Sequence, residues 1–350
     1  MRLINKKSNC VLGLDIGSNT IKAVSLGFDS RGIKLLGYGT APTPRECFDS
    51  DQLKNPGLLV GSIGTLLGSP TYGELAATQL EIALPHQVTK SKIIRLPKNG
   101  SKKDIARLAS SFKNSADVDF DIYSHKIYEL QQKNNFDDIY SVRGLIKNTR
   151  KNLNKELSQI GLHASSFSSQ VDGLSRVIAG RSADRAVWLL DIGETSSRLY
   201  LLGQYGLMHD QYPIGAQKII STISKGFDIS AHEATLLTQK TGLYRGSLGQ
   251  KILSLLRPSL DGLSDRINIS IDKYSNSVDP TNAKKFITTG TIASMPGLSK
   301  YMSRNISLPI EVIEPWSNIN SYPLKPMPKR LDPSYASAIG LAMSAGPIVT

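Results

Sequence analysis

The sequence predicts an α/β protein made of two similarly folded halves. Its 350 residues are more than one ordinary domain needs, and a content of 40% hydrophobic and 20% charged residues is globular. A short acidic-glycine motif occurs twice, as Asp15-Ile16-Gly17 and as Asp191-Ile192-Gly193. Extended apolar segments alternate with helical patterns along the chain, which is typical of the α/β class.

The repeat extends beyond the motif itself. When Asp15 is aligned with Asp191, Lys22 falls on Arg198, because the two basic residues follow at the same spacing. Each copy reads as an apolar strand, a tight turn, a second strand and, after a Gly turn, a third strand. The second strands are expected at 21–26 and 198–202, and the third strands at 33–38 and 207–213. Two related β-hairpin units this far apart indicate a duplicated fold.

Between the two copies the pattern changes. We expect 89–167 to form a small α/β insert, because short strands and helices there do not follow the repeat. The expected elements from this part of the chain are a helix at 53–67, strands at 79–84, 89–96, 122–131 and 138–141, and helices at 101–113 and 142–160.

The second half begins with an expected helix at 168–179 that leads into the second copy of the motif. Ser230 is a plausible N-cap for one of the later helices. The expected elements after the second copy are helices at 216–225, 230–240, 249–274 and 294–305, strands at 285–289 and 310–313, a Pro-rich loop at 318–332, and a last helix at 333–344.

Composition excludes several classes of protein. No apolar run approaches the 18 residues of a membrane span, and the apolar run at 11–14 is too short for a signal peptide. Cys10 and Cys47 are the only cysteines, which suits a reducing compartment, so we expect a cytoplasmic protein. The net charge of +13 comes from scattered basic residues without interleaved aromatics. We therefore expect a solvated basic surface and no specific nucleic acid partner.

The first hairpin carries the clearest chemical signal. Small residues in its turn allow backbone N–H groups to approach a phosphate, and Ser18 and Thr20 add hydroxyl groups. Lys22 follows on the second strand, where its cation suits the β- and γ-phosphates. Asp15 suits Mg²⁺ held through water. The alternative is an ordinary hairpin whose Asp caps the turn. The candidate residues are Asp15, Gly17, Ser18, Asn19, Thr20 and Lys22.

The second hairpin offers the same chemistry, with Asp191 as the second candidate Mg²⁺ residue. Its candidates for phosphate contact are Asp191, Gly193, Thr195 and Ser196. Two facing hairpins of this kind would clamp a Mg²⁺–polyphosphate group. Glu194 would repel a phosphate, so we expect its side chain to point to solvent. Gly290 follows a predicted strand and suits a turn beneath a nucleobase, although a plain strand-to-helix turn explains it equally well.

Other catalytic patterns are missing from the sequence. The five histidines show no metal-ligand spacing, and there is neither a Gly-x-Ser-x-Gly elbow nor a P-loop lysine motif.

These motifs resemble those of the actin, sugar kinase and DnaK-type chaperone superfamily. Residues 15–22 resemble its first phosphate motif and residues 191–197 its second, while 168–180 and 334–345 resemble its two connecting helices. Within the superfamily the chain resembles the PilM family of type IV pilus assembly proteins. The segments that carry this likeness are 11–24, 83–85, 94–97, 189–193, 213–215, 296–298 and 308–315.

The resemblance implies an actin-like ATPase fold that binds ATP and Mg²⁺ in a cleft between two duplicated domains. It adds Gly215, Lys218, Gly290 and Thr291 to the nucleotide-binding residues, and Gln170 as the candidate that positions an attacking water. The adenosine side departs from the family pattern. Ile292 stands where glycine is usual, and Thr235 and Thr238 replace charged residues. We therefore expect weak or lost affinity for ATP, and at most a weak ATPase.

The resemblance also implies domain boundaries and a partner. Domain 1 is expected to comprise 1–88, 168–187 and 330–350, the insert 89–167 resembles the family's 1C subdomain, and domain 2 is expected at 188–329. The implied function is a cytoplasmic scaffold that holds the N-terminal tail of a PilN-like inner-membrane protein and so joins the inner-membrane pilus platform, with self-association left open. The alternatives are an FtsA-like division protein that forms filaments, or a sugar kinase of the same fold.

Overall fold

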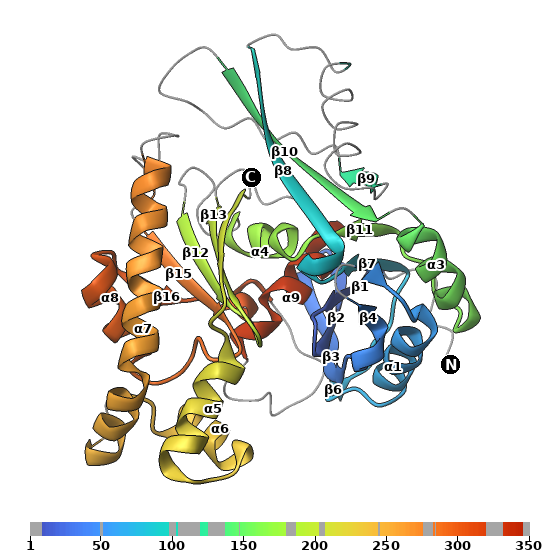
Figure 1. Cartoon of the computed structure of the whole chain (residues 1–350). Helices are drawn as coiled ribbons and strands as arrows, with labels where there is room; N and C mark the ends of the chain where they lie inside the picture. Colours follow the sequence, from blue (N-terminus) through green and yellow to red (C-terminus); the bar gives the residue numbers. More distant parts are fainter. Residues whose placement is uncertain are drawn as a thin grey trace. The chain divides into compact units, whose positions relative to one another are not determined.

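The computed structural model describes residues 9–49, 52–97, 103, 120–124, 137–146, 148–179, 187–202, 207–243, 246–275, 283, 285–319 and 332–345. The chain divides into two compact units (Figure 1). Unit 1 comprises Met1–Arg181, Pro315–Lys329 and Ser337–Thr350. Unit 2 comprises Ser182–Glu314 and Arg330–Ala336.

Unit 1 is built on a mixed six-stranded sheet with the strand order β11-β7-β1-β2-β3-β6. The strands β1, β2 and β3 form an antiparallel meander, whereas β1, β7 and β11 run parallel to one another. The strand bounds are β1 Asn9–Ile16, β2 Thr20–Asp29, β3 Gly32–Pro42, β6 Tyr72–Gly73, β7 Gln79–Ala83 and β11 Ser166–Ser168. Between β3 and β6 along the chain, β4 (Phe48–Asp49) and β5 (Gln52–Leu53) form a separate antiparallel pair of strands.

Unit 2 repeats this arrangement. Its sheet has the order β14-β13-β12-β15-β16, which matches β3-β2-β1-β7-β11 of unit 1 strand for strand and direction for direction. Both second strands even carry a register shift, at Ser25/Leu26 and at Leu199/Tyr200. The predicted duplication is therefore confirmed. The bounds are β12 Val187–Ile192, β13 Ser197–Leu202, β14 Leu207–Tyr212, β15 Lys285–Gly290 and β16 Ile310–Val312.

A separate three-stranded antiparallel sheet in unit 1 has the order β8-β10-β9, formed by β8 Thr89–Pro97, β10 Asp137–Ile146 and β9 Phe120–Ser124. The predicted helix at 142–160 is wrong in its first part. The strand β10 continues to Ile146, and helix α3 starts only at Thr149. Pairing with β8 overrides the local helical pattern, and Asn148, at φ 67°, then turns the chain. Of the expected helix at 101–113 only Lys103 is described, and 125–131 lies outside the described residues.

Helices α1 (Pro56–Gly68) and α3 (Thr149–Gln159) lie side by side in unit 1 (Figure 1). Both contribute to the same hydrophobic core. Leu59 and Ile63 of α1 and Leu153 and Leu157 of α3 are fully buried in one cluster with the apolar side chains of β1. The helix α3 is thus part of the main core of unit 1, although it belongs to the segment expected as an insert.

Two further helices among the described residues of unit 1, α4 (Gln170–Ala179) and α9 (Ala336–Ala342), meet at glycine residues. A methyl group on Gly340 would lie 1.8 Å from the carbonyl oxygen of Gly173, and one on Gly13 of β1 would lie 2.2 Å from that of Ala338. Such distances leave no room for a side chain. The expected helix start at Ser168 is wrong, because Ser168 ends β11 and the helix begins at Gln170.

Unit 2 carries four α-helices among its described residues: α5 Ala216–Phe227, α6 Ala231–Lys240, α7 Gly246–Ser275 and α8 Leu298–Ile306. The predicted N-cap is confirmed, because the Ser230 hydroxyl accepts a hydrogen bond from the Glu233 backbone N–H, and the Glu233 carboxylate accepts one from the Ser230 backbone N–H. The expected start of α8 at Ser294 is wrong. The helix starts after Gly297, which has a left-handed backbone.

Short 3-10 helices complete the described elements: η1 Arg45–Cys47, η2 His86–Val88, η4 Pro315–Asn318, η5 Pro333–Tyr335 and η6 Met343–Ala345. Within the ranges given above, none of the helices combines the length and the apolar character that crossing a bilayer requires.

Candidate functional site

The two acidic hairpins have the same turn. The Gly17 N–H donates to the Thr20 carbonyl at 2.9 Å, and the Gly193 N–H donates to the Ser196 carbonyl at 3.0 Å. Directly across the strand pairs, Asp15 faces Lys22 and Asp191 faces Arg198. The equal spacing of the acidic and basic residues in the sequence therefore corresponds to the same hairpin geometry in each unit.

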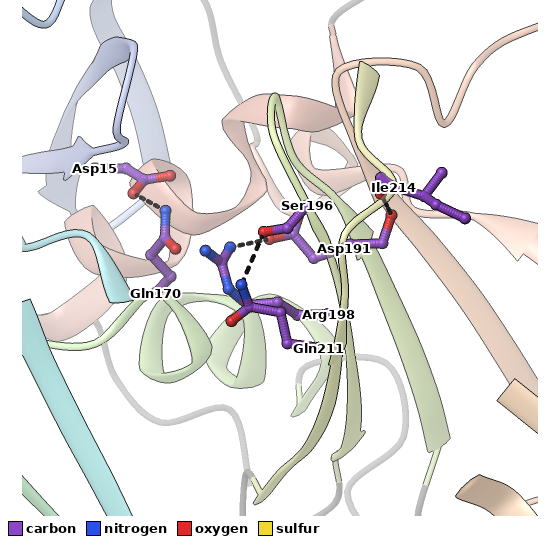
Figure 2. Close-up of polar contacts among 8 residues, drawn as sticks. Asp15, Gln170, Asp191, Ser196, Arg198, Gln211 and Ile214 are labelled. Carbon is purple, nitrogen blue, oxygen red and sulfur yellow. Dashed lines mark hydrogen bonds and ion pairs between the residues drawn. The ribbon is translucent and has the colours of Figure 1, made fainter. Parts of the chain in front are cut away.

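In the first hairpin, Asp15 is held by the residue that begins α4. Its Oδ1 accepts a hydrogen bond of 2.7 Å from Gln170 Nε2 (Figure 2), and Asp15 is only 6% exposed. Thr43 stabilises the turn by two hydrogen bonds of 2.9 Å. Its hydroxyl donates to the Gly17 carbonyl and its N–H donates to the Asn19 carbonyl. The remaining candidates Ser18, Asn19, Thr20 and Lys22 are half-buried around this turn.

In the second hairpin, Asp191 is paired with Arg198. Nη1 of Arg198 lies 3.8 Å from Asp191 Oδ2 (Figure 2), and the two side chains are 12% and 15% exposed. The Arg198 Nε is buried and has no hydrogen-bond partner among the described residues. A buried N–H without a hydrogen-bond partner destabilises the folded state. An anion that accepted a hydrogen bond from this Nε would therefore be bound favourably.

The serine residues of the second hairpin have different surroundings. Ser196 is 7% exposed, and its hydroxyl accepts a hydrogen bond from Gln211 Nε2 at 3.3 Å (Figure 2). The Ser197 hydroxyl donates to the Ile214 carbonyl at 2.5 Å. Thr195 is exposed at the tip of the turn. Among the residues that the structure describes, no acceptor is seen for the Ser196 or Thr195 hydroxyl proton, whereas Ser197 donates its own to the backbone.

Helix α5 starts against this hairpin. Gly215 is its N-cap, and a methyl group there would lie 2.5 Å from the Glu194 carbonyl oxygen. The N–H groups of Ala216 and Gln217 donate to the carbonyls of Gly193 and Glu194, both at 2.9 Å. Lys218 follows on the first turn of α5 and is exposed. The structure thus places Gly215 against the second hairpin and Lys218 on the helical turn that follows it. That these residues bind a nucleotide stays a prediction.

The turn after β15 also meets the hairpin. Gly290 has φ 102°, and the Thr291 N–H donates to the Ile192 carbonyl at 3.0 Å. The Thr291 hydroxyl donates to Glu194 Oε1 at 3.1 Å. The expectation that the Glu194 side chain points to solvent is therefore wrong. Glu194 is half-buried, and its carboxylate accepts a hydrogen bond from another residue of unit 2.

A pocket of about 370 Å³ opens beside the Gly290 turn within unit 2. Its apolar side is formed by Ile220, Ile292 and Met295, and its polar side by hydroxyl groups and by the charged residues Lys240 and Asp332. Thr235 and Thr238, which depart from the family pattern, both line it. Their hydroxyls donate to the carbonyls four residues earlier in α6, both at 2.8 Å, so the two side chains are turned to their own helix.

Sequence reasoning missed several of these residues. Arg198 is not among the residues expected at the site, although its spacing from Asp191 equals that of Lys22 from Asp15. Asp332, Lys240 and Met295 reach the pocket from separate segments, and no local pattern marks them. The described residues contain no group of three or more His, Cys, Asp and Glu side chains that could hold a metal ion.

Solved structures with similar folds define the class of protein. A structure described as a PilM-PilN type IV pilus biogenesis complex matches with a TM-score of 0.72 and 20% identity, covering 95% of this chain and 97% of that chain. The ethanolamine utilization protein EutJ of Carboxydothermus hydrogenoformans matches with a TM-score of 0.56 and 12% identity, covering 96% and 90%. MreB5 of Spiroplasma citri bound to ADP matches with a TM-score of 0.51 and 9% identity, covering 95% and 94%. The fold is that of the actin-like ATPases.

The family follows from the sequence. Residues 133–345 match the model of the type IV pilus assembly protein PilM family, which is more than half of the chain. The chain therefore belongs to the PilM family of type IV pilus assembly proteins. No curated protein matches the sequence.

Proposed function

We propose that the protein is a scaffold of type IV pilus assembly that holds the cytoplasmic N-terminal tail of a PilN-type inner-membrane protein. The observation that carries this proposal is the likeness, over 95% of the chain, to the structure described as a PilM-PilN complex, together with membership of the PilM family. Through that tail the protein would act in the cytoplasm, beside the inner membrane.

The sheets of unit 1 offer main-chain groups for such a tail. Among the described strands, β11 ends the six-stranded sheet and β8 ends the three-stranded sheet. An outer strand has unpaired N–H and C=O groups on one side, and an extended peptide can add to it as a further strand. We propose that the tail binds to unit 1 in this way.

The experiment is a calorimetric titration of the full chain with a synthetic peptide of the PilN-type tail. We expect a scrambled peptide not to bind, and the authentic peptide to bind at 0.1 M and at 1 M salt. Simple attraction to the basic chain would weaken steeply, because the Debye length falls to about 3 Å at 1 M salt. Equal binding of the scrambled peptide would contradict the proposal.

A truncated variant tests the role of the segment that holds β8 and β9. Removing all of 89–167 would also remove Leu145, Leu153 and Leu157 from the main core. Ser91 and Arg143, however, lie opposite each other on antiparallel strands, so a two-residue Asn-Gly turn can join them in place of 92–142. We expect this variant to fold and to lose the peptide. Undiminished binding would exclude β8 and leave β11 as the strand that receives the tail.

We also propose that unit 2 binds a nucleotide. The pocket has the volume of a small-ligand site, and its apolar and hydroxyl-bearing walls fit a nucleobase and a ribose. Ser196, Thr195, Lys218 and the spare donor of Arg198 fit phosphate oxygens. One group does not fit, the Glu194 carboxylate.

Asp191 in unit 2 would hold Mg²⁺ through its waters, and the ion would neutralise phosphate charge. Asp15, the matching acidic residue of unit 1, is proposed for the same role. Asp191 is also paired with Arg198, so the ion would compete with this guanidinium for the carboxylate. The residues of the first hairpin carry matching chemistry, and we propose that they contribute to phosphate binding. Titration with ADP and with ATP, each with and without Mg²⁺, tests this part. No binding of either nucleotide would contradict it.

A further inference from the structure

The second hairpin carries a carboxylate in its turn, that of Glu194. Glu194 follows Gly193 in the turn, and its Oε1 accepts a hydrogen bond of 3.1 Å from the Thr291 hydroxyl. Its backbone carbonyl accepts a second one, of 2.9 Å, from the N–H of Gln217. Side chain and main chain are thus held at once, by the turn after β15 and by the start of α5.

The surrounding backbone keeps Glu194 in place. Gly215 is packed so closely that a methyl group there would lie 2.5 Å from the Glu194 carbonyl oxygen. The hydrogen bond from the Thr291 N–H to the Ile192 carbonyl fixes the other side of the hairpin. These contacts fix the main chain of Glu194, and the hydrogen bond from Thr291 holds its carboxylate beside the turn.

The charge balance of the two hairpins differs at this residue alone. In the first, Asp15 and Lys22 balance each other, and the turn residues between them are uncharged. In the second, Arg198 balances Asp191, to which it is paired at 3.8 Å. Glu194 adds one negative charge to the second hairpin that the first hairpin lacks, beside the Thr195 and Ser196 hydroxyl groups that would receive a phosphate.

We propose that Glu194 is a specificity-determining residue that lowers the affinity of the nucleotide site for phosphate-bearing ligands. The inference rests on the proposed nucleotide site in unit 2. A carboxylate fixed within a few ångströms of a bound phosphate repels it, whereas the uncharged adenosine part in the neighbouring pocket does not feel this repulsion. The site therefore discriminates against added phosphate groups by charge, and the hydrogen bond from Thr291 keeps the charge in place.

The test compares wild type with Glu194→Gln, which removes the charge and keeps an oxygen that can accept from Thr291. Adenosine, ADP and ATP are titrated by calorimetry. We expect ADP and ATP to bind about tenfold more tightly to the variant at low salt, with the gain shrinking at 1 M salt, and adenosine to bind both proteins equally. Glu311→Gln is the matched control, because Glu311 is an exposed glutamate of the same unit.

The possible results distinguish the role of Glu194 from the existence of the nucleotide site in unit 2. If wild type binds nucleotides and Glu194→Gln binds them no more tightly, the role of Glu194 is refuted and the nucleotide site stands. If adenosine gains as much as ADP and ATP, the effect is not repulsion of phosphate and the inference is again refuted. If no ligand binds to either protein, the nucleotide site itself fails. Thermal melting of both variants without ligand confirms that each is folded.

Discussion

Replacing Gly290 by alanine should destabilise unit 2 by about 2–5 kcal/mol. The backbone of Gly290 has φ 102°, which residues other than glycine rarely adopt. Holding alanine at this angle costs about 1–2 kcal/mol. The new methyl group would also lie 2.2 Å from the Ile192 carbonyl oxygen, and relieving such a clash costs about 1–3 kcal/mol. The shift would disturb the hydrogen bond that the Thr291 N–H donates to the same carbonyl.

Gly262 provides a control of opposite sign. It lies within α7, and a methyl group there would meet nothing within 4 Å. Alanine favours a helix by up to about 1 kcal/mol over glycine, so Gly262→Ala should stabilise the same unit. Two identical chemical changes in one unit should therefore move its stability in opposite directions.

Urea unfolding followed by tryptophan fluorescence measures both variants. The chain has two tryptophans, and Trp188 of β12 is buried in unit 2 at 1% exposure. A Trp316→Phe background leaves Trp188 as the reporter of that unit. If Gly290→Ala unfolds at the urea concentration of its parent, or if both variants shift in the same direction, the reasoning from close packing at this turn is refuted.

Four other predictions follow. Asp15→Ala should weaken the Mg²⁺-dependent part of ATP binding in calorimetry, and unchanged binding would remove Asp15 from the site. Hydrolysis by the pure protein should be far slower than the roughly 1–10³ s⁻¹ of ordinary enzymes, so Gln170→Ala should change phosphate release little, and robust release by wild type would contradict this. Leu153→Ala should cost about 2–5 kcal/mol in chemical unfolding because Leu153 is fully buried, whereas exposed Asn152→Ala should cost under about 0.5 kcal/mol. Burial raises the pKa of Tyr212 to about 12, so the unfolded chain ionises first and stability should fall as pH rises from about 10 to 12. Tyr212→Phe should reduce this fall in pH-dependent unfolding.

The parts of the structure that were predictable are those with a local signal. Each acidic hairpin combines a strand, a small-residue turn and a basic residue at fixed spacing, and this pattern is enough to define the turn and its register. The sequence predicts a strand at 138–141 but a helix from 142 onward, whereas β10 continues to Ile146, because the residues that decide this pairing belong to β8, far earlier in the chain. The contact of Glu194 with Thr291 had no local signal either. It depends on the parallel pairing that sets Ile192 opposite Gly290.

The close contact between Gly13 and α9 has a consequence for synthesis on the ribosome. One face of β1 is covered by a helix whose residue Ala338 is added roughly 320 residues later, which at about 5–20 residues per second means a wait of roughly 15–65 s. During that time the strand at the centre of the unit 1 sheet has made its hairpin but lacks its cover. Unit 2, most of which lies in Ser182–Glu314, can complete its sheet meanwhile. The nascent chain therefore exposes an apolar sheet face for most of its translation, and a chaperone that shields this face should raise the yield of folded protein more than one that acts after release.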